Sequence, residues 1–409
     1  MAEVGGSRRA ERPRDAVVRR AVLALLLPLG VAVVAGLVLL WPPSVTPTLQ
    51  GGDLVEGVVL ALAACPDQSA DQCQRADVEV TGGPDSGGVY SVGVPVGPGA
   101  PRIEPGDRVV LQTNVGAPPD QRYVIADFQR GRVLLALAGV FAVAVVVLAR
   151  WRGIAALAGL ATSLAVLVFF VLPAILAGEP PLLVATVGAG AIAFVTMLLA
   201  HGPSLRTGVA LLGVLASLLL TTVLGGLVIE LGEFTGIADE AASFLPAFAS
   251  DVDPRGLLLA GLVIGALGVL DDVTITQAAA VAEIQAADPT QSRRSLRWAG
   301  LRVGRDHVAA TVNTLVLAYA GAAMPLLLLF LLSGSDWSQV LAGELVAQEV
   351  VRTLVGAIGI VAAVPLTTAL AAALIAGRSG YPGGPAAGGT RDAAEAAPAR
   401  PDPPTTEES

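Results

Sequence analysis

Long apolar segments dominate this chain and constrain its fold more than any other feature. About eight windows could span a bilayer: 21–41, 133–149, 154–177, 182–200, 209–231, 256–277, 308–332 and 350–376. Hydrophobic residues make up 54% of the chain and charged residues 14%, whereas an ordinary soluble domain has about 25% charged residues. Such segments cannot all be core helices of a soluble fold of this size. The sequence predicts an α-helical polytopic membrane protein with about eight transmembrane helices, embedded in a lipid bilayer.

The first window follows an arginine-rich segment, residues 1–20, as the apolar core of a signal peptide would. However, it has about 20 apolar residues, and a signal-peptide core has roughly 7 to 15. Trp41-Pro42-Pro43 follows it where a signal peptide would have small residues. We therefore expect a retained transmembrane anchor at 21–41.

The arginines predict the orientation, because short cytoplasmic loops of membrane proteins carry an excess of basic residues. All 25 basic residues are arginines, and they recur on alternate sides of the windows. The outside loops, near residues 179, 233–253 and 336–349, carry acids instead. Both termini are therefore expected on the cytoplasmic side of a cell membrane. A net charge of -9 argues against a nucleic-acid partner. The predicted inside segments contain Arg8, Arg9, Arg12, Arg14, Arg19, Arg20, Arg150, Arg152, Arg206, Arg293, Arg294, Arg297, Arg302, Arg305, Arg378, Arg391 and Arg400.

The segment 42–131 is the one sizeable polar region and is predicted to lie outside the cell. Short β-type runs occur at 53–60, 76–80, 88–94, 107–112 and 123–127, separated by turn residues. They predict a small extracytoplasmic β domain, and an OB-like barrel is the expected form. A seven-helix transmembrane bundle at 132–376 would follow. The tail at 377–409 is rich in Gly, Pro, Ala and Glu, and is expected to be disordered in the cytoplasm.

Both cysteines, Cys65 and Cys73, fall within the predicted outer domain. In an oxidising compartment two such cysteines favour a disulfide, and the competing interpretation is two unrelated reduced thiols. No histidine lies nearby to complete a metal site.

Two adjacent acids, Asp271 and Asp272, interrupt the sixth window. The apolar run 256–270 before them rises only about 22 Å, short of a hydrocarbon core of roughly 30 Å. If the helix spans the bilayer, the acids lie within it, where ionisable groups are costly and usually functional. Thr274 and Thr276 lie on the same helical faces as the acids. Gly261, Gly265 and Gly268 precede the acids at near-helical spacing, which permits close helix packing and would tolerate a break.

The seventh window supplies polar partners at the same depth. An antiparallel arrangement of the two helices places Asn313 level with the acids, each about six residues from the cytoplasmic end. The predicted ion- or solute-binding residues are Asp271, Asp272, Thr274, Thr276, Asn313 and Thr314. The predicted residues of a cytoplasmic mouth are Gln277, Arg305, Asp306 and Tyr319.

These segments carry a family resemblance. Gly265-Ala-Leu-Gly-Val-Leu-Asp-Asp-Val-Thr-Ile-Thr-Gln-Ala-Ala-Ala-Val-Ala-Glu-Ile284 is followed by Gly304-Arg-Asp-His-Val-Ala-Ala-Thr-Val-Asn-Thr-Leu-Val-Leu-Ala-Tyr-Ala-Gly321 and Pro325-Leu-Leu-Leu-Leu. The pair resembles the YibE/F-like family of bacterial multi-pass membrane proteins. The resemblance implies an anchor, an outer domain and a bundle, but no substrate.

Structural interpretations stand beside the functional ones. The acids could cap a helix end or pair with Arg302 or Arg305, and Asn313 could serve as an interhelical hydrogen-bond clamp. The threonines at 221, 222, 367 and 368 are expected to bond to their own backbone. His201 and His307 are expected to be exposed, and no metal site or cofactor is predicted.

Enzyme motifs are absent from the sequence: no Walker loop, nucleophile elbow, His-Glu-x-x-His or dinucleotide fingerprint occurs. Adjacent aspartates also point about 100° apart, which does not suit an intramembrane aspartyl protease. The function we expect is therefore non-enzymatic: a permease for a proton, a cation or a small solute. The alternative is a scaffold or signalling protein whose outer domain binds an envelope partner. The sequence leaves open whether the chain forms a homo-oligomer.

Overall fold

The computed structural model describes residues 13–43, 53–65, 73–94, 96–114, 116–118, 121–238, 244–245, 249, 251–334 and 336–375. The predicted C-terminal tail at 377–409 and most of the basic N-terminal segment lie outside these residues. The chain divides into two compact units. One contains the β domain and helices α2 to α5, and the other contains most of α6, the second half of α8, and helices α9 to α12.

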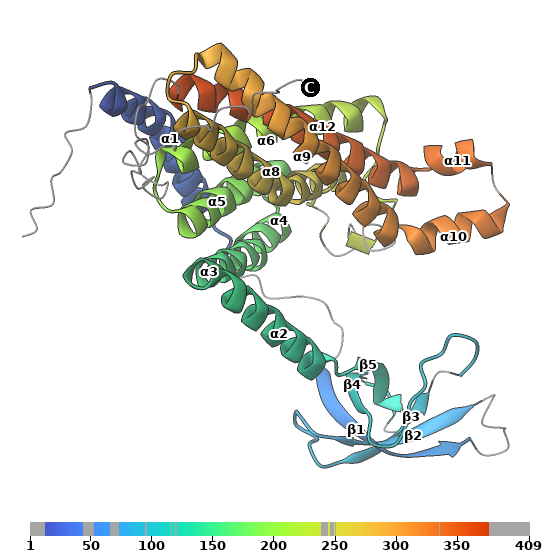
Figure 1. Ribbon diagram of the computed structural model, residues 1–409. Helices are drawn as coiled ribbons and strands as arrows, with labels where there is room; N and C mark the ends of the chain where they lie inside the picture. Colours follow the sequence, from blue (N-terminus) through green and yellow to red (C-terminus); the bar gives the residue numbers. More distant parts are fainter. Residues whose placement is uncertain are drawn as a thin grey trace, which may run out of the picture. The chain divides into compact units, whose positions relative to one another are not determined.

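Five antiparallel strands form the β domain: β1 (Leu54–Ala64), β2 (Gln74–Val80), β3 (Val89–Val94), β4 (Arg108–Thr113) and β5 (Tyr123–Phe128). Their order in the sheet is β3-β2-β1-β4-β5 (Figure 1). Alternate residues such as Val78, Val80, Val109 and Leu111 are fully buried, as the period of two requires. The sequence predicted these strands to within a few residues, because this alternation is local.

The two edge strands of this sheet meet through aromatic side chains. The rings of Tyr90 on β3 and Tyr123 on β5 pack edge to face with centroids 4.7 Å apart. No backbone ladder joins β3 to β5 among the described strands. The sheet is therefore a half-barrel, and the closed OB-like barrel expected from the sequence is not shown.

A polar cluster at this seam involves Asp85. The Tyr123 hydroxyl donates a hydrogen bond of 2.6 Å to its carboxylate, and Arg122 forms a salt bridge of 2.9 Å with it. Burial raises the pKa of Tyr123 to about 12, and the hydrogen bond to Asp85 adds to the shift.

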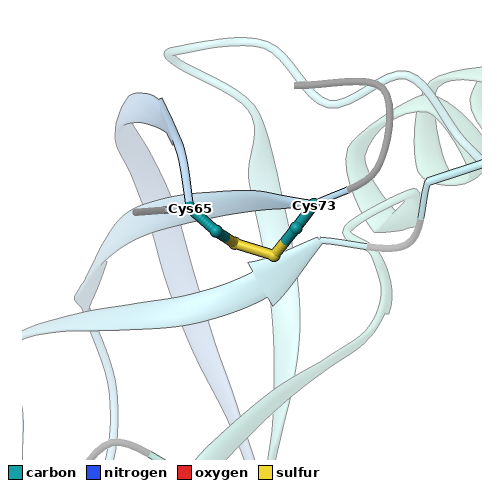
Figure 2. Close-up of a disulfide and its surroundings, with 2 residues drawn as sticks. All are labelled: Cys65 and Cys73. Carbon is teal, nitrogen blue, oxygen red and sulfur yellow. A yellow bond between two sulfur atoms is a disulfide. The ribbon is translucent and has the colours of Figure 1, made fainter. Parts of the chain in front are cut away.

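A disulfide joins Cys65 to Cys73 at the end of the β1–β2 hairpin (Figure 2). The two Cα atoms are 5.5 Å apart, and the Cys65 amide donates to the Cys73 carbonyl. The cross-link continues the register of the last strand pair, Ala64 with Gln74.

The helices account for most of the remaining described chain (Figure 1). Seven are long and apolar enough to cross a membrane, or up to eight if α9 and α10 form one span. The helices are α1 (Pro13–Leu39), α2 (Gly131–Ala149), α3 (Trp151–Val166), α4 (Leu172–Leu176), α5 (Pro181–His201), α6 (Leu205–Leu231), α8 (Pro254–Ala287), α9 (Arg293–Ala322), α10 (Met324–Ser333), α11 (Trp337–Ala342) and α12 (Glu344–Ile375). The π-helical turn Leu167–Val171 joins α3 to α4.

The window predicted at 308–332 is not one straight helix. Its first part is the end of α9 and its second part is α10, and the two are bent by 59°. Pro325 lies in the first turn of α10, where the backbone N–H groups have no partner within the helix, so the missing N–H of proline costs no hydrogen bond. Proline could not, however, continue α9 as one regular helix. The seventh predicted span is therefore bent, and it counts as a span if α9 and α10 cross the membrane together.

Helices α6 and α12 approach closely through two reciprocal pairs of small and polar residues. A Cβ atom added to Gly213 would lie 2.4 Å from the Thr367 hydroxyl, and one added to Gly359 would lie 2.3 Å from the Thr221 hydroxyl. The residues midway between them, Ser217 and Ala363, are fully buried. Glycine is required at both positions for this spacing.

Candidate functional site

The acids lie on α8, which continues through them without a break. Around the acids, four exposed residues follow helical spacing along one face: Gly265, Gly268, Asp272 and Thr276. We call these four residues the α8 stripe. The opposite face, including Leu270 and Thr274, is completely buried. A carboxylate is thus displayed on the exposed side of α8, directly after the apolar part of that helix.

The two adjacent aspartates have different surroundings. Asp272 is exposed on the α8 stripe, whereas Asp271 is half-buried. Thr274 is fully buried, and its hydroxyl donates a hydrogen bond of 3.2 Å to the backbone carbonyl of Asp271, not to a carboxylate. Of the two predicted threonine partners, only Thr276 shares the exposed face of an acid.

Contacts on both sides of the acids fix the register of α8 against α9. Toward the start of α9, Gly304 lies against Gln277, and toward its end, the Tyr319 hydroxyl lies close to Gly265. Asn313 falls between these two levels, as do the acids, so the predicted common depth agrees with this register. Asn313 and Thr314 are nevertheless exposed, and Thr314 donates to its own helix at the Ala310 carbonyl. No hydrogen bond joins Asn313 to Asp272 in the described part of the chain.

Gln277 forms a buried junction between three helices. It is only 2% exposed, and its side-chain amide donates to the Gly300 carbonyl at 2.9 Å and to the Thr368 hydroxyl at 2.7 Å. Thr368 in turn donates to the Val364 carbonyl. A Cβ atom on Gly304 would lie 2.4 Å from the Val364 side chain and 2.8 Å from the side-chain amide oxygen of Gln277. We refer to Gln277, Gly300, Gly304 and Thr368 as the Gln277 junction.

The sequence interpretation missed most of this junction. Thr368 was expected to bond only to its own backbone, but it also accepts from Gln277. The spacing of Gly300 and Gly304, four residues apart, was the available signal, because small residues at this spacing permit close helix contact.

The four residues predicted to form a cytoplasmic mouth do not gather in one place. Gln277 is buried in the junction, whereas Arg305 and Asp306 are exposed. Tyr319 lies about 14 residues, or roughly 21 Å, along α9 from Arg305. The described residues show no salt bridge from Asp272 to Arg302 or Arg305, so the structure does not provide that alternative role for Asp272. A salt bridge of 2.9 Å joins Arg206 on α6 to Glu283 on α8 instead.

Among the residues that the structure describes, no group of three or more His, Cys, Asp or Glu side chains could hold a metal ion. His307 is half-buried instead of exposed as expected, and its Nε2 atom is buried without a hydrogen-bond partner in the described chain.

The YibE/F-like protein family model matches residues 137–377, more than half of the 409 residues. The chain belongs to the YibE/F-like family. The matched range contains the α8 stripe and the Gln277 junction but not the β domain. No curated protein and no solved structure matches the chain. The family and the apolar helices together indicate a membrane protein.

Proposed function

We propose that this YibE/F-like protein is a multi-pass protein of the bacterial cell membrane, with both termini in the cytoplasm and the β domain outside. The exposed apolar surface of α2 supports membrane insertion, because this helix buries none of its residues. Leu135 is 74% exposed and Leu148 is 88% exposed. The arginine distribution supports the orientation.

Within that membrane we propose a permease-type function that moves a proton, a cation or a small solute along the α8 stripe. The observation that carries the proposal is the exposure of Asp272 on a helix that is apolar before it. A charged side chain that faces lipid costs on the order of several kcal/mol, so such a residue normally faces water or a partner group. The helix surface one turn before it is open: a Cβ atom on Gly268 would meet no described atom within 4 Å.

The residues then take different roles. Asp272 binds the proton or cation, and Thr276, one turn further on the same face, contributes its hydroxyl. Asp271 and Asn313 lie at the same level and supply further polar groups. Thr274 and Thr314 bond to backbone carbonyls and shape their helices instead. The proposal involves no enzymatic reaction and no cofactor.

Flux through reconstituted vesicles tests this function. We would compare wild type with Asp272→Asn, and use Glu283→Gln as the matched control, because Glu283 is an exposed acid further along α8. Flux of protons and of monovalent cations would be followed with fluorescent indicators. The proposal expects flux with wild type and Glu283→Gln, and none with Asp272→Asn at equal protein content.

The flux measurements distinguish a permease from a scaffold protein. Undiminished flux with Asp272→Asn would show that the acid is not part of the path. Wild-type vesicles no leakier than empty ones would instead favour a scaffold whose β domain binds an envelope partner.

A further inference from the structure

A basic cavity lies where α9 begins and α12 ends. These helices lie side by side (Figure 1), and the cavity between them has a volume of about 540 Å³. We call it the arginine cavity. Its lining combines three arginines with apolar residues: Arg293, Arg294, Arg297, Trp298, Leu301, Ala369, Ala372 and Ala373.

The three arginines are available to a ligand. All three are exposed, and none forms a salt bridge with any residue that the structure describes. Among the residues that the structure describes, no acidic side chain lines the cavity. In a chain with a net charge of -9, this is a local concentration of positive charge. Guanidinium groups bind phosphate oxygens in a bidentate geometry, so the chemistry favours a phosphate ligand.

The rest of the lining is apolar, which gives the cavity an amphiphilic character. Trp298 is 51% exposed, and Ala372 and Ala373 belong to the last turns of α12, where its apolar segment ends. Tryptophan is enriched at the level of lipid headgroups, and basic residues next to a membrane attract anionic lipids. A soluble anion would leave this apolar wall in water, whereas a lipid would cover it.

We propose that the arginine cavity binds the headgroup of an anionic phospholipid. The arginines hold the phosphate, while Trp298, Leu301 and the alanines of α12 contact the glycerol and the first methylenes of the acyl chains. This site rests on the proposed membrane location but is separate from the α8 stripe, so it stands or falls independently of transport.

Quenching of tryptophan fluorescence tests the site in the full-length protein. The protein would be reconstituted with brominated phosphatidylglycerol or brominated phosphatidylcholine, and the Trp298 signal obtained by difference from Trp298→Phe. We expect phosphatidylglycerol to quench Trp298 at a lower mole fraction than phosphatidylcholine. In Arg294→Gln/Arg297→Gln this preference should fall about thirtyfold, because each arginine near the membrane contributes roughly a fivefold factor.

Two control variants separate the cavity from general surface charge. Arg302→Gln removes an exposed arginine of α9 that does not line the cavity, and should keep the preference. Ala373→Leu fills the cavity without changing the charge, and should weaken the preference. Equal quenching by the two lipids, or an equal loss of preference in Arg302→Gln, would overturn the proposal. Displacement of phosphatidylglycerol by millimolar inorganic phosphate would assign the cavity to a soluble anion and would also overturn it.

Discussion

The side-chain amide of Gln277 donates a 2.7 Å hydrogen bond to the hydroxyl of Thr368, which lies 91 residues later in the chain. This bond joins α8 to α12, and the second bond of the same amide joins α8 to α9. A buried amide that serves three helices holds the α8 stripe in place, since the stripe lies on the opposite face of the same helix.

Removal of the Thr368 hydroxyl should destabilise the bundle. Thr368→Val keeps the side-chain volume but leaves the buried Gln277 amide with one fewer acceptor. We expect a loss of about 1 kcal/mol, the usual size of an interhelical hydrogen bond in membrane proteins. Thermal unfolding in detergent measures it. Thr314→Val, at an exposed threonine, is the control and should unfold close to wild type.

Gly304 should not tolerate even one added methyl group. Gly304→Ala would bring a Cβ atom within 2.4 Å of Val364, and we expect a cost of about 1 to 3 kcal/mol from overpacking. Gly321→Ala on the same helix meets nothing within 4 Å among the described residues, and should be neutral or stabilising. The comparison of the two unfolding temperatures checks the prediction, and equal temperatures would refute it.

The hydroxyl of Tyr123 should ionise only at high pH. Its pKa of about 12 in the folded protein lies above the ordinary value of 10.0, so the folded state disfavours the charged form. The associated stability is present below pH 10 and is lost as the pH rises from 10 to 12. In a spectroscopic titration of the chain's four tyrosines, Tyr123→Phe should remove a component near pH 12. Removal of a component near pH 10 instead would contradict the burial argument.

The two cysteines should resist alkylation until they are reduced. The disulfide between Cys65 and Cys73 leaves no free thiol in the chain. Protein from unreduced membranes should therefore gain no mass from a maleimide, and should gain two adducts after treatment with a reductant. Labelling without a reductant would favour the alternative of two separate thiols.

Local sequence patterns were enough to predict the helices and strands. The contacts that the sequence did not predict depend on residues far away in the chain. The alternation around Val78 and Val80 is visible in the sequence, so the strands could be placed before the structure was known. The bend before Pro325 could also have been predicted, because a proline interrupts a regular helix and its position is given by the sequence. The role of Thr368 could not, since its partner on α8 lies far away in the sequence. The exposure of Asn313 likewise depends on how α9 packs against other helices, and a local sequence pattern does not predict that packing.

The proposed function requires that Asp272 faces water within the membrane-embedded part of the chain. Asp272→Cys and Val273→Cys place a thiol at nearly the same depth but about 100° apart around α8, one position exposed and one fully buried. The reaction rate with a charged, membrane-impermeant methanethiosulfonate reagent reports water access, because only the ionised thiol reacts. We predict that Asp272→Cys is labelled readily and Val273→Cys is not. If both thiols remain unlabelled in the intact membrane, the stripe is covered by lipid or protein, and the proposed path does not exist.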